Sequence, residues 1–174
     1  MHILDTPRLR VRTIGVEDAP FYLALLNTEP FIANIGDRGI RTLQAARDAI
    51  MAGPMAMQKA RGHSIYLVEL KDTGEPIGMA GLIKRDTLED VDLGYGFLPP
   101  HFGRGYASEA ARALLAHARD GIGLRRLLAI TSLHNQASHA LLLKIGMRCE
   151  GVVRLGAEDS ATRLYSIGLI HPGA

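Results

Sequence analysis

The sequence of 174 residues has little cysteine and no tryptophan, and its only thiol belongs to Cys149. One thiol excludes a disulfide framework and a four-cysteine metal site, so packing must hold the fold together. No stretch approaches the roughly 20 apolar residues that a membrane-spanning helix needs. The first residues also lack the basic region and apolar run of a secretory signal. These absences predict a soluble, cytoplasmic protein with no membrane partner.

The sequence also lacks a large excess of either charge, because it has 20 Lys and Arg and 18 Asp and Glu, a net charge of +2. Such a balance argues against a nucleic-acid partner, which would call for a broad basic face. The charges are unevenly placed, however: residues 99–154 hold eight Lys and Arg but three Asp and Glu. That segment is either a solvated basic helix face or a site for a small polyanion.

Metal ligands are not grouped in the sequence. The seven histidines occur singly, and His134 and His139 are five residues apart. That spacing places two side chains on different faces of a helix. Cys149 follows a Gly146-Met147 turn, where a small packed hydrophobe is the expected role for a thiol. We therefore predict no metal site and a buried, unreactive Cys149.

The chain shows no repeat, linker or low-complexity tract, so residues 1–174 are expected to form a single domain. Alternation and helical spacing of apolar residues indicate mixed strands and helices. Strands are predicted over 8–13, 64–70, 76–84, 91–98, 126–132, 151–155 and 163–170. Helices are predicted over 17–27, 42–51, 107–119 and 136–145, with an interruption at Gly53-Pro54. This order predicts an α/β fold in which helices cover a sheet.

One connection between a strand and a helix carries two glycines that flank an arginine, in the segment Phe102-Gly103-Arg104-Gly105-Tyr106-Ala107-Ser108. Glycine permits positive φ and close approach of a ligand, and the free N–H groups of a helix N-terminus bind anions. The segment therefore predicts a pyrophosphate cradle, with a plain glycine-rich turn as the alternative. A Walker A loop is absent, and Ser108 stands where a Rossmann loop needs its third glycine.

The same segment resembles the acyl-coenzyme A binding motif of the GNAT N-acetyltransferases, particularly the branch of RimJ- and RimL-type ribosomal-protein acetyltransferases. In the superfamily pattern Gln/Arg-x-x-Gly-x-Gly/Ala, Gly105 and Ala107 match, whereas Phe102 replaces the first polar residue, as is common in this branch. The resemblance spans nearly the whole chain. It includes Leu4-Asp5-Thr6-Pro7-Arg8-Leu9-Arg10, Leu93-Gly94-Tyr95, Asn135-Gln136-Ala137-Ser138 and Lys144-Ile145-Gly146-Met147.

The resemblance implies a GNAT fold with a mixed, mostly antiparallel sheet that splays between the strands at 91–98 and 126–132, with helices on both faces. It implies acetyl-CoA as the acyl donor and direct transfer to a primary amine, without a metal or an acyl-enzyme. Backbone N–H groups near Phe97 and Leu98 would meet the thioester carbonyl. Asn135 would lie beside the pantetheine arm. Residues 102–108 would cradle the pyrophosphate.

Two residues are candidates for proton transfer in the resembled reaction. Ser138 occupies the position from which such enzymes protonate the departing thiolate, with Tyr106 and Tyr165 as rivals. Asp92 occupies a strand position where related enzymes often place an acid, and it would take the proton of the amine. Structural alternatives exist for both, Ser138 as a polar residue of the first turn and Asp92 as an exposed polar residue. Asn135 has one as well, as a plain N-cap.

The acceptor is left open by the sequence. A protein N-terminus and a small-molecule amine both fit, and residues 29–41, expected to form a loop at the far rim of the cleft, carry no readable signature. Either a monomer or a homodimer is compatible with the pattern. The alternative to an enzyme is a non-catalytic acyl-CoA-binding sensor or assembly module with the same fold.

Overall fold

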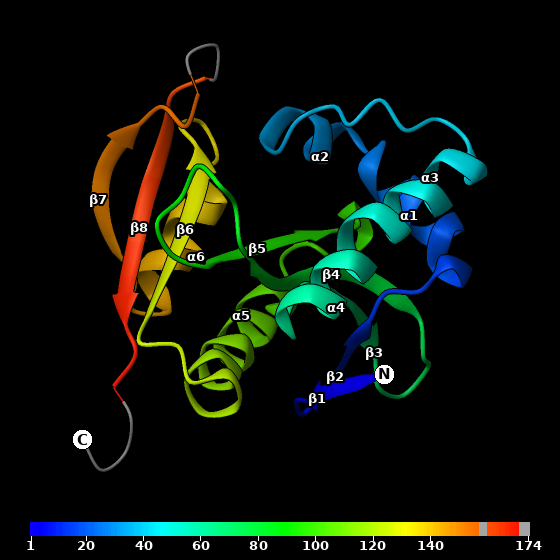
Figure 1. Ribbon diagram of the computed structural model, residues 1–174, viewed down its shortest axis with the longest axis horizontal. Helices are drawn as coiled ribbons and strands as arrows, with labels where there is room; N and C mark the ends of the chain where they lie inside the picture. Colours follow the sequence, from blue (N-terminus) through cyan, green and yellow to red (C-terminus); the bar gives the residue numbers. More distant parts are fainter. Residues whose placement is uncertain (157–159, 171–174) are drawn as a thin grey trace.

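The computed structural model describes residues 1–156 and 160–170 of the chain (Figure 1). Within that part, eight strands form one sheet in the order β1-β2-β3-β4-β5-β6-β8-β7, and every neighbouring pair is antiparallel except β5 and β6. The strands are β1 (His2–Asp5), β2 (Leu9–Thr13), β3 (Ile65–Leu70), β4 (Pro76–Ile83), β5 (Asp92–Phe97), β6 (Arg126–Ser132), β7 (Arg148–Val153) and β8 (Thr162–Gly168). The predicted mixed, mostly antiparallel sheet is confirmed.

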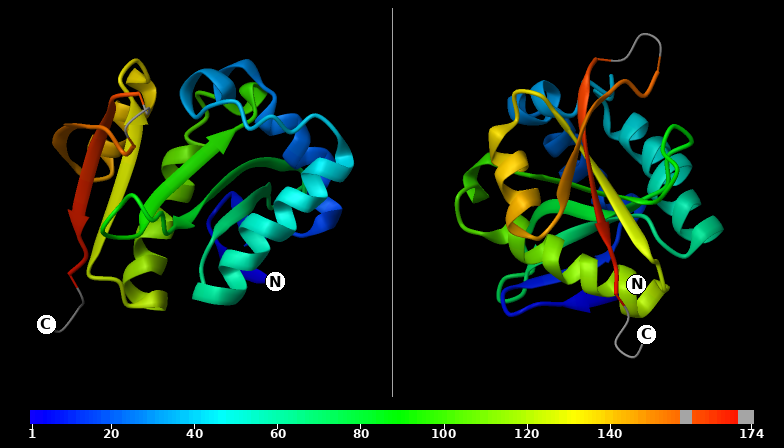
Figure 2. Two further views of the ribbon diagram at one scale, coloured as in Figure 1. Left: turned by 45° about the horizontal axis from the view of Figure 1, so that its top comes forward. Right: turned by 90° about the vertical axis from the view of Figure 1, so that its left-hand side faces the viewer.

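Helices cover both faces of the sheet, as expected (Figure 2). They are α1 (Ala19–Leu26), α2 (Glu29–Asn34), α3 (Leu43–Ile50), α4 (Ala56–Arg61), α5 (Tyr106–Ala116) and α6 (Gln136–Lys144). Leu114 of α5 and Leu142 of α6 belong to one apolar core, while Leu25 of α1 and Phe31 of α2 belong to a second. The apolar side chains of α5 recur at helical spacing, which is why this helix buries one stripe against the strands.

The sheet splays between β5 and β6. These two strands are parallel and pair at one position, Asp92 with Leu128, where the Leu128 amide donates to the Val91 carbonyl at 2.9 Å. Beyond that point β5 and β6 no longer pair, whereas β6 pairs with β8 along its whole length on its other edge, so the two halves of the sheet diverge (Figure 2, left). The divergence predicted from the family resemblance is therefore present, and it opens a space beside β5.

Several local expectations are corrected. Residues 29–41 are not all loop, because α2 begins at Glu29 with Pro30 in its first turn, where the missing amide costs no hydrogen bond. The interruption predicted near Gly53 and Pro54 is confirmed, because α3 ends at Ile50, but the chain does not leave the helical conformation. A π-helical segment (Met51–Met55) absorbs Pro54 and leads directly into α4. Cys149 is exposed on the edge strand β7 and not packed.

Candidate active site

A cleft of about 1360 Å³ opens where β5 and β6 diverge. Its lining comes from β5, the loop before α5, the end of β6, the start of α6, and α2. Small-molecule sites usually measure about 300–1,000 Å³, so this cleft is large enough for an extended ligand together with a second molecule.

The alternation of side chains along β5 divides the cleft between two faces of the sheet. One set of side chains shares the core that α5 covers, and it consists of Leu93, Tyr95 and Phe97. The other set, Asp92, Gly94 and Gly96, faces α2: a Cβ added to Gly96 would lie 3.3 Å from the ring of Phe31. A Cβ added to Gly94 would lie 2.8 Å from Ile83, so both glycines let neighbouring side chains approach the strand closely on this face.

The loop before α5 has the backbone that its glycines predict. Gly103 has φ 71°, and Gly105, the N-cap of α5, has φ 80°, both in the left-handed region that favours glycine. Atoms of Gly103, Gly105, Tyr106 and Ala107 line the cleft, as do those of Phe102 and Ser108. The Ser108 hydroxyl is buried and has no hydrogen-bond partner in the structure. Such an unpartnered donor beside a helix N-terminus fits an anionic ligand.

Arg104 has a different place from its neighbours. Its side chain is exposed, and its carbonyl accepts a hydrogen bond from Nη1 of Arg8 at 2.9 Å. Gly103 and Gly105 line the cleft, but Arg104 between them does not. Contact between the Arg104 guanidinium and a phosphate therefore stays a prediction.

The two predicted backbone donors at the end of β5 differ. The Leu98 amide donates to the Ile77 carbonyl at 2.9 Å, so it belongs to the β4–β5 ladder and the expectation that it meets a thioester is wrong. In an antiparallel pair, successive amides point to opposite edges of the strand. The Phe97 amide therefore points toward β6, where the sheet has opened. Phe97 lines the cleft.

Asp92 is fully buried, and the expectation of an exposed polar residue is wrong. Its carboxylate accepts two hydrogen bonds from Nε of Arg85, at 3.0 and 3.2 Å, and both residues line the cleft. Burial raises the pKa of Asp92, and the positive charge of Arg85 opposes part of that rise. A buried carboxylate with a raised pKa in a cleft is a candidate proton acceptor, and that role stays a prediction.

Ser138 lies in the first turn of α6 and is buried. Its amide donates to Oδ1 of Asn135 at 3.1 Å, which confirms Asn135 as the N-cap. Its Oγ is 2.6 Å from the hydroxyl of Tyr95 on β5, and all three residues line the cleft. Burial raises the pKa of Tyr95 to about 12. The sequence alone does not assign a role to Tyr95. The one feature that points to this residue is the Leu93-Gly94-Tyr95 motif of the family resemblance.

The two other candidate tyrosines, Tyr106 and Tyr165, are less well placed than Ser138 to reach a ligand in the cleft. Tyr106 lines the cleft, but its ring lies under the guanidinium of Arg8, 4.5 Å from the ring centre. Tyr165 on β8 is fully buried, and its hydroxyl is 2.6 Å from Nδ1 of His139. Tyr165 does not contribute to the lining of the cleft.

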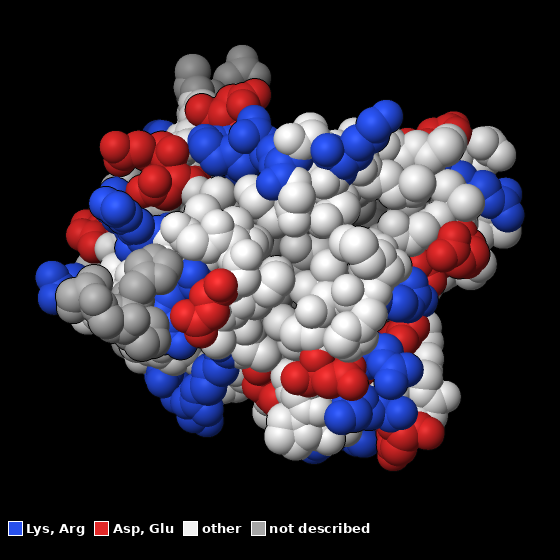
Figure 3. Space-filling model, turned by 60° about the horizontal axis from the view of Figure 1, so that its bottom comes forward, with Lys and Arg blue, Asp and Glu red and all other residues white. Residues whose placement is uncertain are grey.

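Other kinds of site find little support in the described part of the chain. Residues 1–156 and 160–170 contain no group of three His, Cys, Asp or Glu side chains that could hold a metal ion. None of their helices is long and apolar enough to cross a membrane. On the face in Figure 3, blue and red side chains both lie around a large uncharged area. That face is therefore not the broad basic surface typical of nucleic-acid binding.

Comparisons with known proteins agree with this geometry. Residues 8–148 match the family model described as "Acetyltransferase (GNAT) domain". The chain is 31% identical over 170 residues to YoaA of Bacillus subtilis, described as an uncharacterized N-acetyltransferase, and the match covers 95% of this chain and 96% of YoaA. The crystal structure of an acetyltransferase from Agrobacterium tumefaciens is 27% identical, with a TM-score of 0.80 over 94% of this chain and 92% of that one. RimL, a ribosomal L7/L12 α-N-protein acetyltransferase solved in complex with coenzyme A, shares the fold at 17% identity, with a TM-score of 0.82 over 97% of this chain and 98% of that one.

Proposed function

The chain belongs to the GNAT acetyltransferase family and is an acetyl-CoA-dependent N-acetyltransferase, and from that premise we propose that it transfers the acetyl group to a protein N-terminus or a small-molecule amine within a ternary complex. One observation carries the proposal. The cleft between β5 and β6 joins a glycine cradle for an anion to two buried polar side chains, Ser138 and Asp92.

The donor is held mainly by main chain in this proposal. Acetyl-CoA supplies an acetyl group already activated as a thioester. The amides of the turn at Gly103 and Gly105, with the positive end of the α5 dipole, bind its pyrophosphate. The hydroxyl of Ser108 adds a side-chain donor, and Asn135 lies beside the pantetheine arm. The Phe97 amide, pointing into the opened edge of β5, donates to the thioester carbonyl.

Ser138 acts on the leaving sulfur through a hydrogen bond. When Tyr95 donates to Oγ of Ser138, the hydroxyl hydrogen of Ser138 is free to point at the sulfur. A thiol has a pKa of about 8.5, well below the value of about 12 for Tyr95, so the sulfur leaves as a thiolate and the two hydroxyls keep their protons. The acid role expected for Ser138 becomes stabilisation of negative charge without proton transfer.

Asp92 removes the proton of the amine through a chain of ordered waters, because the Phe97 amide lies five residues, about 16 Å, farther along the extended strand. Burial raises the pKa of Asp92 and so brings the carboxylate closer to the working range of a base, while the ion pair with Arg85 favours its ionised form. Asp92 and Tyr95 are three residues apart on opposite faces of an extended strand, which is about 10 Å along the chain. The amine therefore approaches from the α2 side and the thioester from the α5 side.

A panel of amines tests the proposal: N-terminal peptides, free amino acids, polyamines and aminoglycosides are each offered with acetyl-CoA. Free thiol release gives the rate, and mass spectrometry locates the acetyl group. We expect saturable thiol release with at least one class. Binding of acetyl-CoA without release across the panel would favour a non-catalytic module, and absence of binding would contradict the donor site itself.

A further inference from the structure

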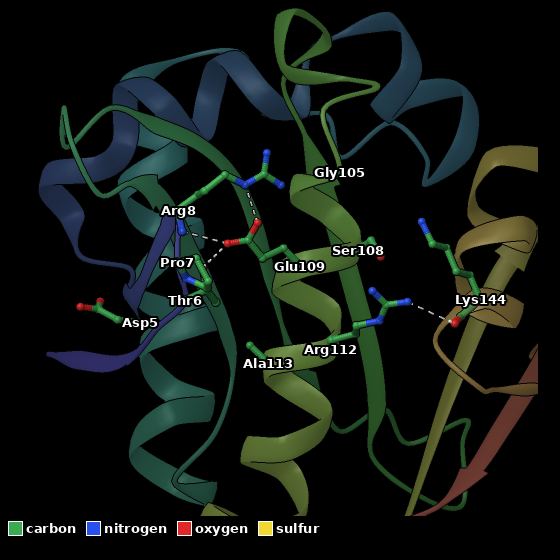
Figure 4. Close-up of a pocket in the computed structure, with 10 residues that line it drawn as sticks. All are labelled: Asp5, Thr6, Pro7, Arg8, Gly105, Ser108, Glu109, Arg112, Ala113 and Lys144. Carbon is green, nitrogen blue, oxygen red and sulfur yellow. Dashed lines mark hydrogen bonds and ion pairs between the residues drawn. The ribbon is translucent and has the colours of Figure 1, made fainter.

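Arg8, which directly precedes β2, reaches the first turn of α5 about a hundred residues later in the chain (Figure 4). Its Nε donates to Oε2 of Glu109 at 2.6 Å, and its backbone amide donates to Oε1 of the same carboxylate at 2.9 Å. The hydroxyl of Thr6 also donates to that Oε1, at 2.6 Å. Burial acts to raise the pKa of Glu109, but these hydrogen bonds outweigh it and the pKa is lowered. The carboxylate therefore stays ionised and neutralises Arg8.

The rest of the Arg8 guanidinium holds the residues on both sides of Gly105. Nη1 donates to the carbonyl of Arg104 at 2.9 Å, and the guanidinium carbon lies 4.5 Å from the centre of the Tyr106 ring. A Cβ added to Gly105 itself would be 3.3 Å from Nη2. One side chain thus contacts the residues on both sides of Gly105, passes close to Gly105, and ties the turn to the first turn of α5 through Glu109.

A turn with glycines at 103 and 105 has wide conformational freedom, so ordering it on ligand binding would weaken the affinity. Contacts that order the turn beforehand remove that entropic cost. We propose that Arg8 is a positioning residue for acetyl-CoA: together with Glu109 it orders the turn so that its amides face the pyrophosphate. Because Glu109 neutralises the guanidinium, Arg8 acts through the turn and does not serve as the phosphate-binding cation. The inference rests on the proposed function, which assigns the pyrophosphate to this turn.

The test compares Arg8→Gln with a matched control, Arg10→Gln, two residues later on β2. Arg10 is exposed and its Nε lies 3.5 Å from Asp5, so the control removes an equal charge without touching the turn. Two readouts are needed: Kd for acetyl-CoA by calorimetry, and kcat/KM with S-acetylpantetheine, a donor that lacks the pyrophosphate. For Arg8→Gln we expect Kd to rise about tenfold or more, with the S-acetylpantetheine rate unchanged. Arg10→Gln should match the wild type in both.

Two further variants separate positioning from other roles. Glu109→Gln should weaken acetyl-CoA binding in the same direction as Arg8→Gln, whereas unchanged or tighter binding would mean that a released Arg8 binds phosphate itself. Arg8→Lys keeps a charge for Glu109 but lacks the planar fork that also spans Arg104 and Tyr106, so its Kd should be intermediate. It also serves as the folded comparison if Arg8→Gln proves unstable.

Three results would overturn the inference: wild-type Kd in Arg8→Gln or Arg8→Lys, an equal loss with S-acetylpantetheine, or tighter binding in Glu109→Gln. Each of them leaves the donor site intact, provided that the wild-type protein binds acetyl-CoA. If the wild type itself does not bind acetyl-CoA, the proposed donor site fails and this inference fails with it.

Discussion

Replacing Ser138 with alanine removes the hydroxyl that lies 2.6 Å from the Tyr95 hydroxyl. A hydrogen bond to a charged group contributes roughly 1.5–3 kcal/mol. The developing thiolate is a weak base and accepts such a bond poorly, so we take a value just below this range, about 1.4 kcal/mol or a tenfold fall in kcat. Because the proposed donor site consists mainly of main-chain groups, Kd for acetyl-CoA should stay near the wild-type value. A loss confined to kcat is the mark of an interaction made only as the sulfur leaves.

The hydroxyl of Tyr95 should behave as one unit with Ser138. Tyr95→Phe leaves Ser138 without its donor, so we expect a similar fall in kcat, and the double variant should be no slower than Ser138→Ala. The assay is thiol release at saturating donor and amine. Tyr165→Phe is the control, because it removes a buried hydroxyl bonded to His139 outside the cleft, and it should lower Tm while leaving kcat unchanged.

An unchanged kcat in Ser138→Ala would refute the reasoning and leave Tyr106 or water to assist the sulfur. Full additivity of the two losses would show that Tyr95 and Ser138 act separately. A rise in Kd equal to the fall in kcat would instead indicate that the α6 N-terminus had shifted.

Other predictions concern the donor turn and the base. Acetyl-CoA at 100 times its Kd should stabilise the protein by about 2.7 kcal/mol, measured as a rise in Tm, and Gly105→Val should abolish that rise. Gly123→Val places valine at the same left-handed conformation beyond α5, so it should lower Tm but keep the ligand shift. The proposed role of Asp92 as the base needs its ionised form, and burial raises its pKa, so kcat/KM should fall as pH drops through a value above that of an ordinary Asp. Asp92→Asn should abolish this fall in kcat/KM at low pH, and Arg85→Gln should move it to higher pH. Arg126→Gln, a surface variant, should leave it unchanged.

Elements defined by local chemistry were predicted closely. β6 runs from Arg126 to Ser132 as expected, and α6 begins after Asn135, whose side chain makes the predicted cap. Elements without such signals were missed. β1 has four residues, too few for an alternating pattern to be recognised. α2 was not predicted because Pro30, in its first turn, resembles a residue that ends a helix.

The donor turn was also predictable, because positive φ at Gly103 and Gly105 depends on the glycines themselves. The long-range contacts of the site were not. Tyr95 and Ser138 are 43 residues apart, and Arg8 and Glu109 are 101 apart. No spacing rule within one helix or strand links such pairs, so they depend on how the sheet and helices pack.

β5 shows where local reasoning about a site stops. A strand has two side-chain faces and two hydrogen-bonding edges. Alternation assigns Asp92 to one face, but its complete burial and its ion pair with Arg85 follow from tertiary packing that no local pattern shows. The register with β4 decides which edge each amide faces. The Leu98 amide donates to the Ile77 carbonyl of β4, and the Phe97 amide therefore points toward the open side of the sheet. Since a shift of one residue in that register would exchange the two amides, the contact with the thioester carbonyl depends on strand pairing and not on which side chain stands at position 97 or 98.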